Sequence, residues 1–404
     1  MPHTRPSAWR AVAAATALNA PLGSLYAFSV FLKPLEALLG LSRADLALVF
    51  ALASAGFGIG MNVAPRVFGV ASPAVLVLAC AGASAFGSAI AATAGGLVQL
   101  ALGYGILFGL GGGAAYILTQ QGVNLSLTRR HGLVNGYIVS LWPAGAMIAA
   151  PLFGWSIANY GVRATLGGLA AVVAITGSLS AWLISHPGLT LTAAARVEPD
   201  ATERRRAVFW RLWLTFFLAA SAGLMVLSQA AGIITAYGGT TTLAIYGTTF
   251  VAATVAVARL GGGWMVDYLT IPRVAVGAHA IAVIGNVALT LWPGAAVSVL
   301  ALTLVGVGYG MISGLTAAAV AVYWRHALYG RIASRIYLAW CAAAIVLPIT
   351  AGKLFDLTHG YGVAILIAAV GNVLGIMVSL GLPRQQPARA TSRVDRAPGA
   401  ELLR

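Results

Sequence analysis

The sequence predicts an all-α membrane protein with twelve transmembrane helices in two pseudo-symmetric six-helix halves. Of its 404 residues, 60% are hydrophobic and only 8% are charged, whereas a soluble protein carries about 25% charged residues. Twelve apolar runs follow one another, each close to the roughly 20 residues that a membrane-spanning helix needs. The second half of the chain also repeats the first half loosely, as in transporters built from internal repeats.

The expected spans are separated by short polar gaps. The first span begins in the segment MPHTRPSAWRAVAAATALNA, which resembles a signal peptide because basic residues are followed by an apolar stretch and small residues. Its apolar run continues past any cleavage point to Phe31, so we expect an uncleaved span. Ser42 followed by Asp45 predicts the N-terminus of the second span. The expected ranges are 10–32, 43–65, 71–93, 97–124, 133–158, 164–185, 209–236, 243–266, 274–292, 295–322, 333–352 and 361–383.

A polar segment at 186–208 divides the chain almost in half and predicts a cytoplasmic linker. It separates an N-terminal bundle, 1–185, from a C-terminal bundle, 209–384, and a basic tail at 385–404 is expected to be disordered. The segment from Arg129 recurs loosely from Arg325 as a basic loop, a glycine, an aromatic-rich span, a proline and a glycine. This repeat supports the two-bundle organisation.

The distribution of lysine and arginine predicts the orientation of the chain. With both termini inside, all but five of the 24 basic residues lie in the N-terminus, the inner loops, the linker and the tail. The outer side holds Lys33, Arg43, Arg163 and Lys353, and Arg259 lies within a span. We therefore expect a multi-pass protein of the inner cell membrane with both termini cytoplasmic.

Composition and motifs exclude several classes of function. The net charge of +15 does not indicate a nucleic-acid partner, because the arginines lie in short gaps between apolar runs. The two cysteines fall in apolar runs and form neither a disulfide framework nor a metal site. Without a G-x-x-x-x-G-K-[ST] loop, the glycine clusters 109–113 and 306–310 serve helix packing rather than phosphate binding. No cofactor and no enzyme activity are expected, and the missing loop excludes a self-contained ATP-driven pump.

Arg259 lies inside the apolar run from Ala244 to Arg273. It is eight residues before Asp267, roughly 12 Å along a helix, which places it near the middle of a hydrocarbon core about 30 Å thick. A charge there costs at least about 2.5 kcal/mol and usually faces a water-filled cavity, a partner or an anionic ligand. The alternative is a structural arginine bonded to helix carbonyls or to a neighbouring helix.

Gly263 and Asp267 form a G-x-x-x-D pattern that Arg273 follows. Together with twelve spans, a central linker and internal symmetry, this pattern resembles the loop signature of the major facilitator superfamily. Glycine allows two helices to approach closely, and the aspartate can pair with the arginine or meet a helix end. The resemblance implies the major facilitator fold and a gating role for this loop. The corresponding first-half loop keeps Arg66 but has no aspartate.

The first two spans allow a narrower assignment. Tyr26 to Leu35 reads YAFSVFLKPL, and Ser42 to Asp45 reads SRAD. Both segments resemble the oxalate/formate antiporter family and its monocarboxylate-transporter relatives. The resemblance implies transport of small carboxylates, with an arginine of the eighth span, here Arg259, contacting the substrate.

Two departures from that family concern charge. Trp340 stands where the oxalate-specific members carry a lysine, and Val255 stands where many monocarboxylate transporters have an acid one turn before the arginine. A cavity with one cation favours a substrate with a single carboxylate.

The resemblance also suggests further residues that line the cavity. Three aromatic residues fall where the family places cavity aromatics, and packing or interfacial anchoring is the alternative for each: Tyr26, Tyr116 and Trp142. Four polar residues offer hydrogen bonds to a substrate or between helices: Gln120, Asn124, Ser313 and Thr316. His279, in the ninth span, is expected to be structural.

We therefore expect a monomeric secondary active transporter that moves a small organic anion, a monocarboxylate, across the bilayer by alternating access. The alternative within transport is an efflux or uptake carrier for a hydrophobic drug or a neutral solute. A membrane enzyme or a receptor would need more titratable groups in the membrane than Arg259. The sequence leaves open the exact substrate, its direction of movement, and antiport versus proton symport.

Overall fold

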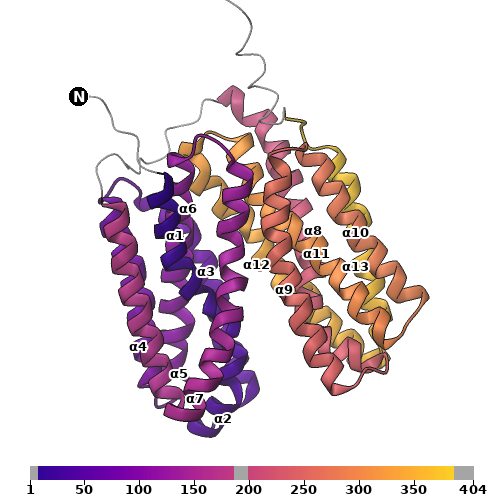
Figure 1. Cartoon of the computed structure of the whole chain (residues 1–404), viewed down its shortest axis with the longest axis horizontal. Coiled ribbons are helices and arrows are strands. Elements are labelled where there is room, and N and C mark those ends of the chain that lie inside the picture. Colours follow the sequence, from indigo (N-terminus) through magenta and orange to yellow (C-terminus); the bar gives the residue numbers. More distant parts are fainter. Residues whose placement is uncertain (1–7, 186–198, 386–404) are drawn as a thin grey trace, which may run out of the picture. The chain divides into compact units, whose positions relative to one another are not determined.

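The computed structural model describes residues 8–185 and 199–385, and there the chain is helical almost throughout (Figure 1). In these residues the one β-type pairing is an isolated bridge between Phe68 and Ala71. The predicted fold class is therefore confirmed. The first thirteen residues of the predicted linker and nearly all of the predicted tail lie outside the described residues.

Residues 8–185 of the described chain contain nine helical segments. They are α1 (Ala8–Leu22), the 3₁₀ segment η1 (Gly23–Phe31), α2 (Leu32–Leu39), α3 (Arg43–Val67), α4 (Pro73–Ala92), α5 (Leu97–Leu100), the π-helical segment η2 (Ala101–Phe108), α6 (Gly109–Ser126) and α7 (His131–Ile184).

The described residues 199–385 contain seven segments. They are α8 (Pro199–Ala236), α9 (Thr241–Val266), α10 (Ile271–Leu291), α11 (Ala295–Tyr323), the 3₁₀ segment η3 (His326–Leu328), α12 (Tyr329–Thr358) and α13 (Gly362–Leu380). Because α8 begins at Pro199, the last residues of the predicted linker are helical.

The helices agree with the predicted spans. Within the described residues, ten helices are long and apolar enough to cross a membrane. One of them, α7, has 54 residues, or about 80 Å, which is enough for two crossings of a core about 30 Å thick. It is broken at Gly161, where φ is 82°, a backbone conformation that favours glycine. Hence α7 supplies the fifth and sixth spans, and α12, with 30 residues, supplies the eleventh.

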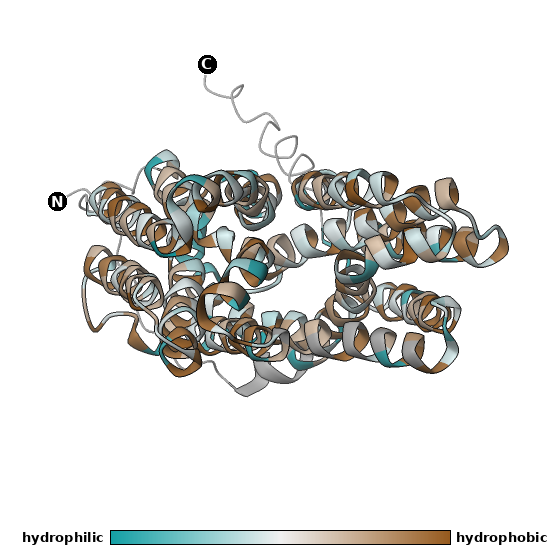
Figure 2. Ribbon diagram, turned by 90° about the horizontal axis from the view of Figure 1, so that it is seen from below, coloured by the Kyte–Doolittle hydropathy of each residue, from teal (hydrophilic) through white to brown (hydrophobic). Residues whose placement is uncertain are grey.

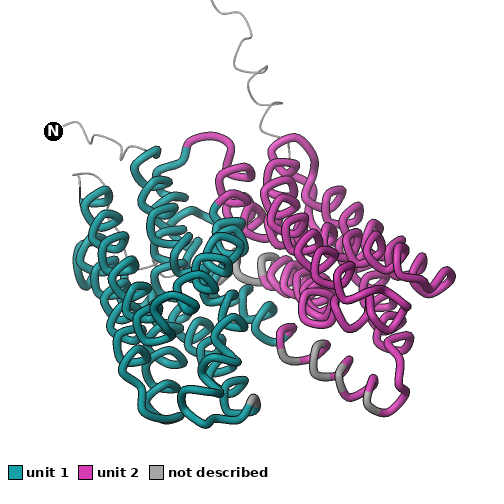
Figure 3. The backbone as a smooth tube through the Cα atoms, turned by 60° about the horizontal axis from the view of Figure 1, so that its bottom comes forward, with its two compact units in different colours: residues 1–127, 138–199, 324–342 teal, residues 128–137, 200–323, 343–404 magenta. Residues whose placement is uncertain are grey.

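Contacts between Cα atoms divide the chain into two compact units (Figure 3). Unit 1 comprises residues 1–127, 138–199 and 324–342, and unit 2 comprises 128–137, 200–323 and 343–404. Both α7 and α12 contribute residues to each unit. The predicted bundles, 1–185 and 209–384, divide the chain at the linker instead, and that division stays a prediction.

Local signals explain where several helices begin and bend. At the predicted start of the second span, Ser42 and Asp45 form a capping box at the N-terminus of α3, so two of the free N–H groups of that helix end are satisfied. The first span is longer than predicted and continues through η1 to Leu39. In η1, a Cβ atom at Gly23 would overlap the carbonyl oxygen of Trp142. The change of helix type therefore coincides with a close approach to α7.

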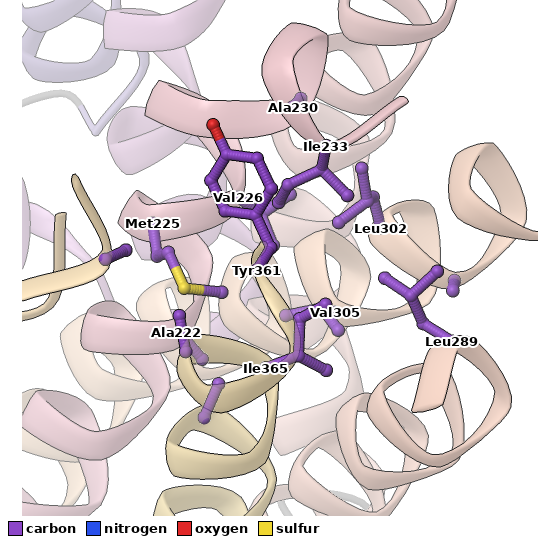
Figure 4. Packing of buried hydrophobic residues seen from close by; sticks show 14 of the residues in the cluster. Ala222, Met225, Val226, Ala230, Ile233, Leu289, Leu302, Val305, Tyr361 and Ile365 are labelled. Atoms are coloured by element: carbon purple, nitrogen blue, oxygen red, sulfur yellow. The ribbon is translucent and has the colours of Figure 1, made fainter. Parts of the chain in front are cut away.

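Glycines set the spacing between α3 and α6 in unit 1, and an apolar core holds the helices of unit 2 together. In unit 1, a Cβ at Gly109 or Gly113 of α6 would overlap the backbone of α3. In unit 2, α8 to α13 all contribute to an apolar core that includes Met225, Leu302 and Tyr361 (Figure 4). Apolar residues run along the helices (Figure 2), and large ones such as Leu380 remain 67% exposed. Such outward apolar surface is what a bilayer covers.

Candidate substrate-binding site

Arg259 lies on α9 in unit 2 and is only 4% exposed. Its backbone is enclosed by glycines, because a Cβ at Gly314 of α11 would overlap the Arg259 carbonyl oxygen and Gly136 of α7 lies against the same oxygen. These contacts hold the arginine backbone in a fixed position within the unit. Among the described residues it is the one arginine or lysine in the buried class.

Tyr309 of α11 holds the guanidinium of Arg259. The Nη2 atom of Arg259 donates a hydrogen bond of 2.9 Å to the Tyr309 hydroxyl, and Cζ lies 5.3 Å from the centre of the same ring, within range of a cation–π interaction. Gly223 of α8 leaves room for this ring, since a Cβ there would overlap it. Sequence reasoning missed Tyr309, although a lone tyrosine in the glycine-rich stretch VGVGYG was a signal.

The other cavity positions that the sequence suggested in unit 2 lie on α9 and α11. Ser313 is buried one turn after Tyr309. The Thr316 hydroxyl donates to the Ile312 carbonyl of its own helix at 2.7 Å. Val255, where some relatives of the resembled family have an acid, is buried and packs against the position of Gly306.

Unit 1 brings together all four predicted aromatic residues. The Tyr26 ring centre lies 5.9 Å from that of Trp142 and 5.9 Å from that of Trp340. Tyr116 lies edge-on to Trp142 at 5.9 Å. Phe57 joins Trp142 at 4.7 Å and Trp340 at 6.3 Å. With Tyr337, these residues form what we call the aromatic cluster.

Polar groups fix the orientation of this cluster. The hydroxyls of Tyr116 and Tyr337 are hydrogen-bonded at 2.9 Å. The indole N–H of Trp142 donates to Oδ1 of Asn19 at 3.2 Å, and Nδ2 of Asn19 donates to the Thr119 hydroxyl at 2.9 Å. Phe57, Tyr337 and Asn19 were not predicted. The asparagine in the first apolar run was the available signal.

Gln120 and Asn124 follow Tyr116 on α6. Nδ2 of Asn124 donates to the backbone oxygen of Gln120 at 2.9 Å. Gln120 is fully buried, and neither polar atom of its amide has a hydrogen-bond partner in the described part of the chain. A buried unpaired amide is unfavourable, so Gln120 offers both a donor and an acceptor to a ligand or to water.

The predicted gating loop makes a helix-end contact within unit 2. The two carboxylate oxygens of Asp267 accept hydrogen bonds of 2.9 Å from the backbone N–H groups of Gly132 and Leu133. These groups belong to the first turn of α7, so Asp267 caps that helix and complements its dipole. Gly263 makes the approach possible, since a Cβ there would overlap the Gly132 carbonyl. Arg273 is exposed at the start of α10.

His279 occupies a core position on α10. Its Nδ1 atom lies 2.9 Å from Oδ1 of Asn372 on α13. Gly375 leaves space for the imidazole, because a Cβ there would overlap the ring. This packing between α10 and α13 fits the structural role expected from the sequence.

Comparison with known proteins identifies the family. A family model described as Major Facilitator Superfamily matches residues 12–348. The chain belongs to the major facilitator superfamily. The MFS-type transporter YhjX of Escherichia coli (strain K12) is 26% identical to it over 292 residues, which is 67% of this chain and 69% of YhjX.

Solved structures of superfamily members share the fold. FucP in the outward conformation has a TM-score of 0.75 at 15% identity, covering 91% of this chain and 97% of FucP. The proton:xylose symporter XylE gives 0.70 at 14% identity, with coverage of 95% and 98%. The human organic anion transporter MFSD10 gives 0.70 at 16% identity, with coverage of 93% and 100%. At these identities the likeness is one of fold.

Membership in the superfamily determines the general function. Its members are transporters rather than enzymes, and the fold carries out secondary transport. This major facilitator protein is therefore a multi-pass membrane protein that transports a small molecule. The narrower resemblance to oxalate/formate antiporters and monocarboxylate transporters remains a prediction.

Proposed function

We propose that this major facilitator protein carries a small organic anion with a single carboxylate, and that it does so by alternating access. Arg259 is the observation that carries the proposal. A guanidinium that is 4% exposed in a membrane span is costly to maintain, and intramembrane charges most often mark the path of a substrate or ion.

A carboxylate fits the chemistry of this arginine. The planar guanidinium can donate two parallel hydrogen bonds to the two carboxylate oxygens. Tyr309 holds one side of the group through Nη2, and this restricts its rotation before a ligand binds. A site that is ordered in advance loses less conformational entropy on binding.

Within unit 1, the aromatic cluster offers the kind of surface that small organic ligands contact. Its rings supply apolar surface, and the hydroxyl pair of Tyr116 and Tyr337 and the amide of Gln120 supply hydrogen-bonding groups. Trp340 has no charge to offer a second carboxylate. A dicarboxylate such as oxalate would have one charge without a cation, which is strongly unfavourable in a low-dielectric site.

The same cluster favours a second candidate function. Six aromatic residues without a charged member resemble the mostly apolar lining of pockets for neutral or hydrophobic small molecules. Uptake or efflux of such a solute would leave Arg259 as a structural residue bonded to Tyr309. The two candidates differ in whether ligand binding requires the guanidinium.

A thermal-shift screen of the purified protein tests the proposal. A ligand that binds only the folded state stabilises it by about 2.7 kcal/mol at 100 times its dissociation constant. Formate, lactate or pyruvate should raise the melting temperature of the wild type, and Arg259→Ala should abolish the shift. Stabilisation by neutral sugars or hydrophobic drugs, retained in Arg259→Ala, would instead support the second candidate.

A further inference from the structure

Three arginines of unit 1 gather where the end of α3 meets the start of α12. Arg66 is in the last turn of α3, and Arg331 and Arg335 are in the first two turns of α12. Nδ2 of Asn62 donates to the Ser334 carbonyl at 3.1 Å, which joins these turns directly. All three arginine side chains are exposed, and Arg335 experiences the charges of the other two. We call them the arginine cluster.

The cluster is electrostatically unfavourable by itself. Arg331 and Arg335 are four residues apart on one helix, where like charges repel, and they lie at a helix N-terminus, which already carries partial positive charge. In the described part of unit 1 the acidic residues are Glu36 and Asp45. Asp45 is at the start of α3, about 30 Å of helix away from Arg66. The positive-inside rule accounts for basic residues on the cytoplasmic side of the membrane. It does not require three arginines to lie together.

The surface beside the cluster is apolar. On α3, Ile59 is 55% exposed and Val63 is 40% exposed, and Leu338 of α12 is 42% exposed. The two helices touch along this line, because a Cβ at Gly58 would lie 3.1 Å from the Cys341 sulfur. The α3–α12 seam therefore presents positive charge at one end and apolar side chains along the rest.

We propose that the α3–α12 seam binds an anionic phospholipid. The phosphate accepts hydrogen bonds from the arginine cluster, since guanidinium groups recognise phosphate oxygens and basic clusters at the membrane surface select anionic head groups. An acyl chain covers Ile59, Val63 and Leu338. A soluble phosphate has the same head-group chemistry, but it would leave the apolar part of the seam uncovered. This proposal is independent of the transported substrate.

Lipid binding to the purified, delipidated full-length protein tests this assignment. We expect phosphatidylglycerol to bind more tightly than phosphatidylcholine in native mass spectrometry. The double variant Arg66→Gln/Arg335→Gln should bind phosphatidylglycerol roughly 25-fold more weakly, because each basic side chain near an anionic surface contributes about a fivefold factor. The matched variant Arg163→Gln/Arg384→Gln, which also removes two exposed charges, should bind it like the wild type.

Two further measurements separate the possible ligands and do not depend on the variants. Inorganic phosphate should fail to displace phosphatidylglycerol from the wild type, and added salt should reduce the preference for the anionic lipid. Equal binding of the two lipids would overturn the proposal, as would equal loss of affinity in both double variants. Complete displacement by inorganic phosphate would identify a soluble-anion site and would also overturn it.

Discussion

Arg259 and Tyr309 show what a single residue pair contributes to recognition. The guanidinium donates to the Tyr309 hydroxyl at 2.9 Å, and the proposed carboxylate needs two further parallel bonds from the same group. Arg259→Lys keeps the charge but cannot reproduce this geometry. Loss of one charge-assisted bond, about 1.5–3 kcal/mol, should reduce uptake roughly 10- to 150-fold. Uptake is measured in cells at matched membrane levels, with Arg163→Lys as control. Wild-type uptake by Arg259→Lys would show that bidentate contact is not required.

Trp340 tests the number of charges that the transporter accepts on its substrate. Its ring lies in the aromatic cluster, 5.9 Å from Tyr26, where the resembled oxalate carriers have a lysine. Trp340→Lys should improve oxalate relative to a monocarboxylate by about tenfold or more, because coupling between close charges is at least about 1.5 kcal/mol. The measurement is competition by oxalate against a labelled monocarboxylate. Trp340→Leu removes the ring without adding charge and should not improve oxalate. An unchanged ratio in Trp340→Lys would contradict the expectation of a single cation.

At the scale of helices, the apolar runs of the sequence predict the long helices better than they predict changes of helix type within them. The twelve apolar runs and the Ser42–Asp45 capping box depend on local composition, which a sequence displays. The 3₁₀ segment η1 coincides with a contact between Gly23 and Trp142 that is distant in sequence. Phe57 and Tyr337 escaped prediction because an aromatic residue in an apolar span looks the same whether it faces lipid or a neighbouring ring.

The contact of Asp267 with α7 predicts separable effects on stability and transport. Removing a helix cap costs about 0.5–2 kcal/mol, so Asp267→Ala should lower the unfolding free energy by that amount. Asp267→Asn should lose less, because an amide oxygen can still accept one of the two bonds. Asp45→Ala, which breaks the capping box of α3, is the matched control.

Asp267→Ala and Asp45→Ala should lose similar stability, because each variant removes a helix cap. If the loop from Gly263 to Arg273 acts as a gate, only Asp267→Ala should also change the transport rate. Thermal unfolding and initial uptake rates give the two quantities. Equal uptake by both variants would leave Asp267 a helix cap without a gating role.

For the whole molecule, the basic residues predict both termini on the cytoplasmic side of the inner membrane. Reporter fusions in the predicted linker 186–208 and at Arg404 should both give an inner signal. This follows from the excess of arginine in the corresponding loops and tail. An outer signal from either fusion would contradict the predicted orientation.

The distribution of acids bears on energy coupling. In the sequence, all nine acidic residues lie at the ends of the expected spans or outside them, whereas proton relays in transporters usually use carboxylates or histidines within the membrane. We expect either exchange of anions or a proton that moves with the substrate carboxylate. Uptake with and without internal anion at fixed pH distinguishes these modes. Loss of proton coupling in His279→Gln alone would contradict the structural role of that histidine.

Transport of a monocarboxylate is tested most directly by counterflow in liposomes that contain the purified protein. Vesicles loaded with unlabelled lactate or pyruvate should transiently accumulate the labelled anion from outside. Formate should compete, and oxalate and fucose should compete poorly. Arg259→Ala should show no accumulation while remaining folded and inserted. Equal counterflow in Arg259→Ala and wild type, or counterflow of neutral solutes without any of carboxylates, would contradict the proposed function.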